Sequence, residues 1–118
     1  MKMIKIYGIP NCGSVKKAFV WLNENKIKFE FVDFKKEGVT KNKIEEWLTK
    51  QPMEILLNKK GTTWKGLTGV AQKKSKDEKE AIKLLIENTS LIKRPVIEAG
   101  ENVLVGFDEE IYKSLLNR

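Results

Sequence analysis

Cysteine, histidine and arginine are scarce in this chain of 118 residues, and each scarcity excludes a class of site. Cys12 is the only cysteine, so the chain cannot form an internal disulfide. Because histidine is absent, Cys12 has no soft partner for a zinc or iron–sulfur site, and we expect no metal. The lack of a secreted disulfide framework leads us to expect a reducing, cytoplasmic compartment.

Long apolar runs are also missing. No stretch reaches the roughly 18 apolar residues of a transmembrane helix, and the N-terminus lacks a signal-peptide pattern, so we expect no membrane association. The formal net charge is +7, but arginine contributes only Arg94 and Arg118. Recognition of phosphates or base edges usually draws on the planar arginine fork. We therefore interpret the charge as a dispersed lysine surface and expect no direct nucleic-acid binding, while an anionic partner or small anion stays open.

The hydrophobic pattern predicts a β-α-β unit at the N-terminal end. Residues 3–7 are rich in β-branched and aromatic side chains and stop at Gly8, which is typical of a strand. Apolar residues then recur at helical spacing over 14–25, and residues 27–34 mostly alternate as a second strand. A helical crossover between neighbouring strands implies that they are parallel.

The middle of the chain reads as helical, from about residue 40 to residue 90. Apolar stripes around Trp47 and Leu85 predict two helices, and Ser75 with Glu78 predicts a capping box before the second one. Short helical pieces joined by turns are expected between them.

The C-terminal third predicts a β-hairpin and a last helix. Strands are expected at 95–97 and 103–105, on either side of a turn at Gly100, and Asp108 is a good N-cap for the helix. The element order βαβ, helices, ββα predicts a single α/β domain with a mixed four-stranded sheet flanked by helices.

Cys12 stands just before the first predicted helix, where a thiolate is favoured. Unpaired backbone N–H groups and the helix dipole stabilise an anion there, and Lys16 lies about one turn away. A free cysteine has a pKa of about 8.5, so these groups would raise its thiolate fraction at neutral pH. The alternative interpretation is a small, buried apolar residue without chemistry.

The neighbours of Cys12 supply further candidates for substrate binding. Asn11 and Ser14 offer hydrogen-bonding groups, and Gly13 would let a substrate approach the backbone closely. Val15 occupies the second cysteine position of a C-x-x-C motif, so a resolving thiol must come from outside the chain.

Two more places could bind an anion. Arg94 could form a fork for an oxyanion or carboxylate, and Pro95 could present a backbone carbonyl at the start of a strand. Lys59 and Lys60 could surround an anion in a turn. Each has a plainer alternative, because isolated arginines and lysine-rich turns are usually solvent exposed and most X-Pro bonds are trans.

Four segments carry a family resemblance that spans essentially the whole chain. The chain resembles the arsenate reductase (ArsC) and Spx family, and is most similar to its YffB-like branch. The resemblance implies a thioredoxin-like fold in which residues 1–34 and 91–118 form the core and about 39–90 a helical insertion. The segments are 7–12 (YGIPNC), 56–64 (LLNKKGTTW), 93–96 (KRPV) and 105–107 (VGF).

The resemblance also implies residue roles. Cys12 matches the redox cysteine of the family, and Arg94 matches the arginine before its cis-proline, here Pro95. Lys59 or Lys60 lies near a further basic anion-binding residue of the reductases. Phe107 lies where arsenate reductases supply an additional arginine, and the histidine that often precedes their catalytic loop is absent, which counts against efficient arsenate reduction.

We therefore expect a thiol-dependent oxidoreductase with glutathione as co-substrate, acting on a small thiol, a disulfide or an oxyanion. One alternative is an arsenate reductase, which would use glutathione and glutaredoxin. The other is an Spx-like regulator that binds the C-terminal domain of the RNA polymerase alpha subunit. Two positions depart from the regulator pattern. Val15 stands where many regulators have the second cysteine of a C-x-x-C switch, and a glycine that the regulators use in polymerase contact is replaced near Gln51.

Overall fold

The alternating and helical patterns at the N-terminal end form a β-α-β unit in the computed structural model, which describes residues 4–116. The chain divides into two units. The sheet unit comprises the described residues of Met1–Glu37 and Arg94–Arg118, and the helical unit is Gly38–Lys93. Each is described by itself.

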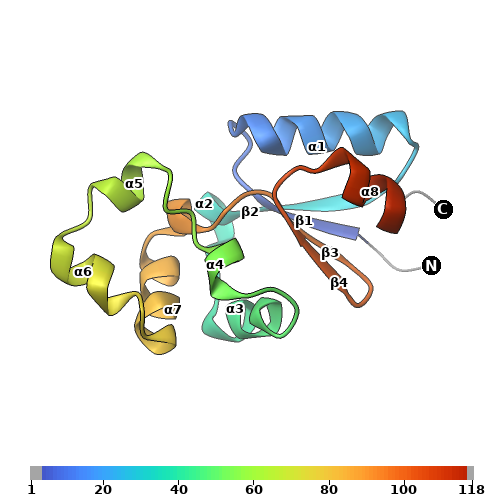
Figure 1. Ribbon diagram of the computed structural model, residues 1–118. Helices are drawn as coiled ribbons and strands as arrows, with labels where there is room; N and C mark the ends of the chain where they lie inside the picture. Colours follow the sequence, from blue (N-terminus) through green and yellow to red (C-terminus); the bar gives the residue numbers. More distant parts are fainter. Residues whose placement is uncertain (1–3, 117–118) are drawn as a thin grey trace. The chain divides into compact units, whose positions relative to one another are not determined.

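The sheet unit contains a mixed four-stranded sheet, as predicted (Figure 1). Its strand order is β2-β1-β3-β4. Strand β1 pairs in parallel with β2 and antiparallel with β3, and β3 pairs antiparallel with β4. The strands are β1 (Ile4–Gly8), β2 (Phe29–Asp33), β3 (Val96–Ala99) and β4 (Asn102–Val105).

Helices α1 (Gly13–Glu24) and α8 (Glu109–Leu115) cover the same face of this sheet (Figure 1). Their apolar stripes pack on Ile6 of the central strand, which is fully buried. Trp21 of α1 meets Tyr112 of α8 edge-on, with ring centroids 5.4 Å apart. Asp108 caps α8 by accepting a hydrogen bond from the backbone N–H of Ile111, as predicted, which contributes about 1 kcal/mol.

The second strand is shorter than the predicted range 27–34, for reasons visible at both ends. Before it, the N–H of Ile27 donates to the carbonyl of Leu22, so Ile27 takes part in the hydrogen bonding that ends α1 and is not part of the strand. After it, the Asp33 side chain accepts from the N–H of Lys35 and starts α2 (Phe34–Glu37).

The helical unit consists of short helices, as the pattern predicted. Trp47 and Leu85 are fully buried on two of them, which confirms both apolar stripes. Leu57 and Ile92 form an isolated β-bridge. The elements are α3 (Lys41–Leu48), α4 (Met53–Leu56), α5 (Thr62–Lys65), α6 (Gly69–Lys74), α7 (Glu78–Glu87) and the 3-10 helix η1 (Thr89–Leu91).

The predicted capping box at Ser75 and Glu78 is wrong. Asp77 is the N-cap of α7, and its carboxylate accepts a hydrogen bond from the N–H of Glu80. Ser75 instead ends α6, where its hydroxyl donates to the carbonyl of Gln72. A carboxylate gains more than a hydroxyl from the positive end of a helix, which explains why Asp77 takes the position.

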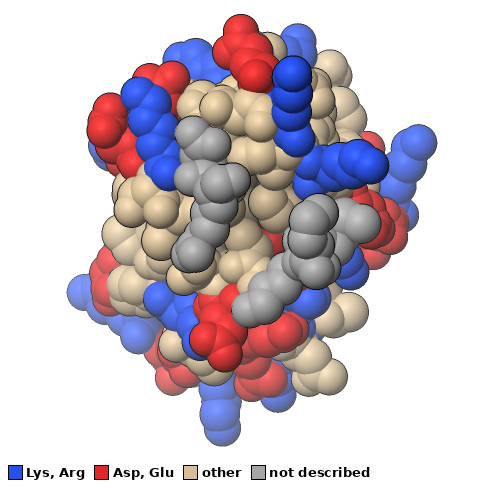
Figure 2. All heavy atoms as spheres, turned by 90° about the vertical axis from the view of Figure 1, so that its right-hand side faces the viewer, with Lys and Arg blue, Asp and Glu red and all other residues tan. Residues whose placement is uncertain are grey.

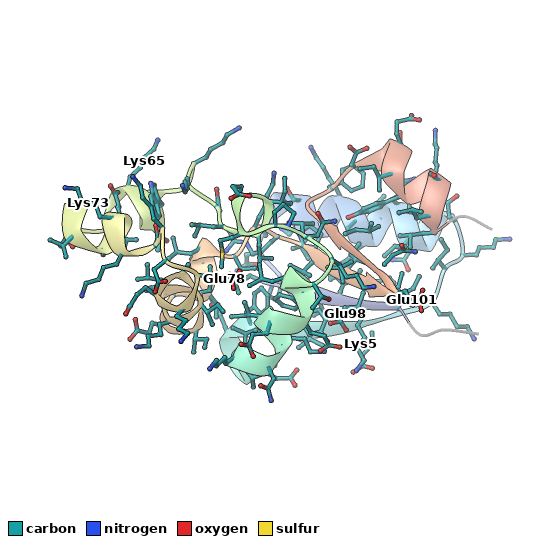
Figure 3. The ribbon with its side chains drawn as sticks, turned by 60° about the horizontal axis from the view of Figure 1, so that its bottom comes forward. Lys5, Lys65, Lys73, Glu78, Glu98 and Glu101 are labelled. Carbon is teal, nitrogen blue, oxygen red and sulfur yellow. The ribbon has the colours of Figure 1, made fainter. Side chains whose placement is uncertain are left out.

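Charged side chains are distributed without a continuous area of one sign on the face shown in Figure 2. In the helical unit, Lys65 and Lys73 are exposed on α5 and α6 (Figure 3). In the sheet unit, Lys5 of β1 lies opposite Glu98 of β3 in the antiparallel register (Figure 3). Within residues 4–116, no helix is both long and apolar enough to cross a membrane.

Candidate functional site

Cys12 is the N-cap residue of α1, at the end of the loop that follows β1. Its backbone is extended, with φ −84° and ψ 129°, and its carbonyl accepts the first hydrogen bond of the helix, from the N–H of Lys16 at 3.0 Å. Its own N–H donates to the carbonyl of Ile9 at 3.1 Å, which closes the loop. Cys12 is partly exposed, so its thiol is both anchored and accessible.

Opposing effects act on the pKa of the Cys12 thiol. Partial burial raises the pKa, because a thiolate loses hydration there. The backbone N–H groups of Val15 and Ser14, and then the guanidinium of Arg94, favour the thiolate and outweigh that burial, so the pKa falls below its ordinary value. The neutral thiol makes no capping hydrogen bond of ordinary geometry, so these donors act chiefly on the charged form.

Arg94 precedes β3, and its guanidinium lies close enough to the Cys12 thiol to favour the thiolate. Its Nε is buried and has no hydrogen-bond partner among the described residues. A buried donor without a partner costs about 1–3 kcal/mol, and an anion bound beside Cys12 would remove that cost. The Arg94–Pro95 peptide bond is cis, as the family resemblance implied.

Gly8 lets three segments of the site approach one another. A Cβ at this position would lie 2.8 Å from Cγ2 of Val15 and 3.9 Å from Cβ of Arg94. The end of β1 therefore packs directly against the first turn of α1, and close to the segment that carries Arg94. The sequence pattern indicates Gly8 only as the end of a strand, because this close approach joins residues distant in sequence.

Pro95 is buried, and its carbonyl accepts a hydrogen bond from the N–H of Gly106 at 2.8 Å. This hydrogen bond ties the start of β3 to the residue that follows β4, and the part of Pro95 in aligning a substrate through the neighbouring backbone stays a prediction. Gly106 has φ 84°, and its own carbonyl accepts from the hydroxyl of Tyr112 at 2.7 Å. No local sequence signal identifies Gly106 or Tyr112 as a support of the site. Burial, and then the charge of Asp108, raises the pKa of Tyr112, so its hydroxyl remains a hydrogen-bond donor.

The other predicted residues near Cys12 divide into exposed and structural ones. Asn11, Gly13 and Lys16 are exposed, and a Cβ on Gly13 would meet nothing within 4 Å, so the start of α1 is open. Ser14 is half-buried inside the helix, and its hydroxyl does not cap the helix, because Cys12 is the N-cap residue. The backbone N–H of Ser14 contributes instead.

Lys59 and Lys60 lie in the helical unit, in the exposed loop between α4 and α5. The Nζ of Lys59 is 5.3 Å from the ring centroid of Trp64, and the N–H of Lys60 donates to the side-chain oxygen of Asn58. Their part in binding an anion stays a prediction. Among residues 4–116, no group of three or more His, Cys, Asp or Glu side chains is arranged to hold a metal ion.

Comparison with known proteins identifies the family of this chain. A sequence model of the ArsC family matches residues 7–115. A solved structure described as YffB (PA3664) protein is 36% identical with a TM-score of 0.92, covering 97% of this chain and 99% of that chain. The solution structure of an arsenate reductase (ArsC) related protein from Brucella melitensis is 35% identical with a TM-score of 0.75, over 98% of this chain and 96% of that chain.

A curated relative carries a different name. The global transcriptional regulator Spx 2 of Lactococcus lactis is 31% identical over 118 residues, which is 98% of this chain and 88% of the relative. The order of strands and helices is that of a thioredoxin-like fold with flanking helices, as the resemblance implied. The chain belongs to the ArsC family.

Proposed function

We propose that this protein is a thiol-dependent oxidoreductase in which Cys12 is the nucleophile and glutathione is the external resolving thiol. The observation that carries the proposal is the pairing of Cys12, with its lowered thiol pKa, and Arg94, with its buried and unpartnered Nε. One group supplies the attacking sulfur and the other a binding position for an anionic substrate. We place the reaction in the cytoplasm, where reduced glutathione is abundant.

The reaction consists of two thiol–disulfide exchanges. In the first, the Cys12 thiolate attacks one sulfur of a disulfide; that S–S bond breaks, a new one forms to Cys12, and the other sulfur leaves as a thiolate. In the second, a glutathione thiolate attacks the mixed disulfide and releases Cys12. The second exchange leaves glutathione in a disulfide with the sulfur that Cys12 had captured, so one glutathione thiol is oxidised and the other half of the substrate is released as a thiol. When the captured half is itself glutathione, the product is oxidised glutathione. Each departing thiolate takes its proton from solvent.

The need for an external thiol follows from Val15. This residue takes the place of a second cysteine, is fully buried, and packs beneath Gly8. It serves the packing of α1 on β1 and has no redox chemistry. Glutathione can act as the external thiol because it carries both a thiol and two carboxylates, one of which the guanidinium of Arg94 would bind.

Incubation with oxidised glutathione tests this proposal. We expect mass spectrometry of the intact protein to show one glutathione added, and peptide mapping to place it on Cys12. The matched control is Cys12→Ser, which should remain unmodified. Absence of an adduct, together with a Cys12 pKa at or above that of free cysteine, would overturn the proposal.

Arsenate reduction is a second candidate, because the Arg94 guanidinium and the start of α1 would also suit an oxyanion. Phe107, in the region where arsenate reductases carry an arginine, counts against it. Turnover of arsenate with glutathione and glutaredoxin, lost in Cys12→Ser, would favour this candidate over disulfide exchange.

An Spx-like regulator is the third candidate, and the 31% identity to a protein of that name favours it. In this case the fold would serve as a docking surface for the C-terminal domain of the RNA polymerase alpha subunit. Binding between the purified domain and this protein, measured by calorimetry, would support regulation. Lack of binding at high concentration would exclude it.

A further inference from the structure

A groove of about 330 Å³ runs along α1 within the sheet unit. One wall is α1, and the other is the segment that leads into α8. Trp21 lines it as well, with most of its own side chain buried in the core. The remaining lining residues are Lys16, Lys17, Val20, Glu24, Phe107 and Glu109.

Both walls of the groove lead back to Cys12. Residues four apart lie along one inclined row of a helix surface, so Cys12 is followed on that row by Lys16 and Val20. On the other wall, Phe107 directly follows Gly106, whose N–H donates a hydrogen bond to the carbonyl of Pro95. Pro95 in turn follows Arg94, which lies beside Cys12. The leaving half of a disulfide that Cys12 attacks can therefore extend into the groove.

The charged residues along α1 do not complement the helix dipole. Acidic side chains stabilise the start of a helix and basic ones its end, but α1 has no acidic residue in its first turn and no basic residue in its last. Lys16 and Lys17 follow the first turn, and Glu24 is the last residue. None of these three forms an ion pair with a residue of 4–116. Their charges are thus available to a ligand.

The groove also exposes apolar surface. Val20 is 56% exposed, and Phe107 is half-buried beside it. Glutathione has no apolar side chain that could cover these groups, whereas a polypeptide has many. A polypeptide also suits the basic end of the groove, because an acidic residue beside its reacting cysteine would meet Lys16 and Lys17.

We propose that this groove binds the polypeptide part of the substrate, which is a protein cysteine in mixed disulfide with glutathione. An acidic residue next to that cysteine pairs with Lys16 and Lys17, and a neighbouring apolar side chain covers Val20 and Phe107. The inference rests on the proposed function and names its substrate class. The Cys12 thiolate attacks the glutathione sulfur, the protein thiolate leaves and is protonated, and a second glutathione then releases Cys12 as oxidised glutathione forms.

Three substrates separate this inference from the proposed function. The first is a short peptide with an acidic residue before, and a leucine after, a cysteine in mixed disulfide with glutathione. The second is the same peptide with lysine in place of the acidic residue. The third is the mixed disulfide of glutathione with 2-mercaptoethanol, whose mercaptoethanol half has no charged or apolar side chain to contact the groove. Formation of oxidised glutathione is measured for each.

We expect wild type to prefer the acidic peptide over the lysine peptide by about fivefold in kcat/KM, the size of one favourable charge contact, and to lose that preference at high salt. Lys17→Glu should reverse the preference, which a folding defect cannot do. Val20→Glu should lower kcat/KM for the acidic peptide by about fivefold and leave the small disulfide within about twofold of wild type.

Two control variants carry the same changes outside the groove. Lys36→Glu on α2 alters the net charge equally, and Val70→Glu on α6 replaces a valine that is 65% exposed. Neither should alter the peptide preference. Equal rates for both peptides in wild type, with normal turnover of the small disulfide, would overturn the groove assignment alone. No turnover of any disulfide would overturn the proposed function. An altered KM for glutathione in Val20→Glu, without a change in peptide preference, would assign the groove to glutathione and so refute the inference.

Discussion

The loop that carries Cys12 and the loop that carries Lys59 and Lys60 are both predicted to bind anions, and the structure builds them differently. The Cys12 loop leads into a 12-residue helix, whose first N–H groups favour the thiolate, and Arg94 stands beside it. The Lys59–Lys60 loop leads into a helix of only four residues, and both lysines are exposed. Fixed donors at the start of a long helix lower the pKa of the Cys12 thiol, whereas the two lysines offer exposed charge, and their part in binding an anion stays a prediction.

The largest expected effect is that of removing the nucleophile. Cys12→Ser should lower disulfide turnover by about a thousandfold or more, because a serine hydroxyl is not ionised near neutral pH. The assay is glutathione-dependent reduction of a mixed disulfide. Substantial residual turnover in the purified variant would assign the chemistry to another residue, and the Cys12 loop would then no longer differ from the lysine loop in reactivity.

Next comes the guanidinium beside the thiol. Arg94→Gln should lower kcat/KM by about 10- to 100-fold, since it removes the charged hydrogen bond that we propose for the substrate and the charge that favours the thiolate. Arg94→Lys keeps the charge without the planar fork and should recover only part of the loss. Full activity in the glutamine variant, with an unchanged melting temperature, would remove Arg94 from the site.

The packing beneath the site gives a smaller, structural effect. Gly8→Ala would place a Cβ 2.8 Å from Cγ2 of Val15, which is fully buried. We expect a loss of about 1–3 kcal/mol in the free energy of unfolding, measured by urea denaturation. The matched control is Gly13→Ala, whose Cβ meets nothing within 4 Å and should leave that free energy within about 0.5 kcal/mol of wild type.

The smallest effect belongs to the lysine loop. Lys59→Ala and Lys60→Ala, alone or together, should change kcat/KM by less than about twofold, because exposed charges act weakly through solvent. Steady-state kinetics at low and high salt measure this. A tenfold rise in the KM for the substrate, with kcat unchanged, would instead support the predicted anion site at Lys59 and Lys60.

Much of the fold could be predicted from sequence, because its signals are local. The β-branched and aromatic residues before Gly8, the helical stripe after Cys12 and the N-cap at Asp108 each act within a few residues. Ser75 was mistaken for a cap because Ser and Asp both suit that position, and only the folded chain decides between Ser75 and Asp77.

Less of the site could be predicted, because its parts meet through long-range contacts. Cys12 was identifiable from its place before a helix. The unpartnered Nε of Arg94, the hydrogen bond from Gly106 to Pro95 and the exposure of Val20 beside Phe107 all depend on how β3, α1 and α8 pack. No spacing along the chain encodes those contacts.

The surroundings of Cys12 favour its thiolate. The rate of alkylation of wild type by iodoacetamide, followed against pH, measures the pKa directly, because only the thiolate reacts. The rate should rise as the thiol ionises and reach its plateau at a lower pH than for free cysteine, whose pKa is about 8.5. Arg94→Gln should move the midpoint of the curve to higher pH. A wild-type midpoint at or above that of free cysteine would contradict the account.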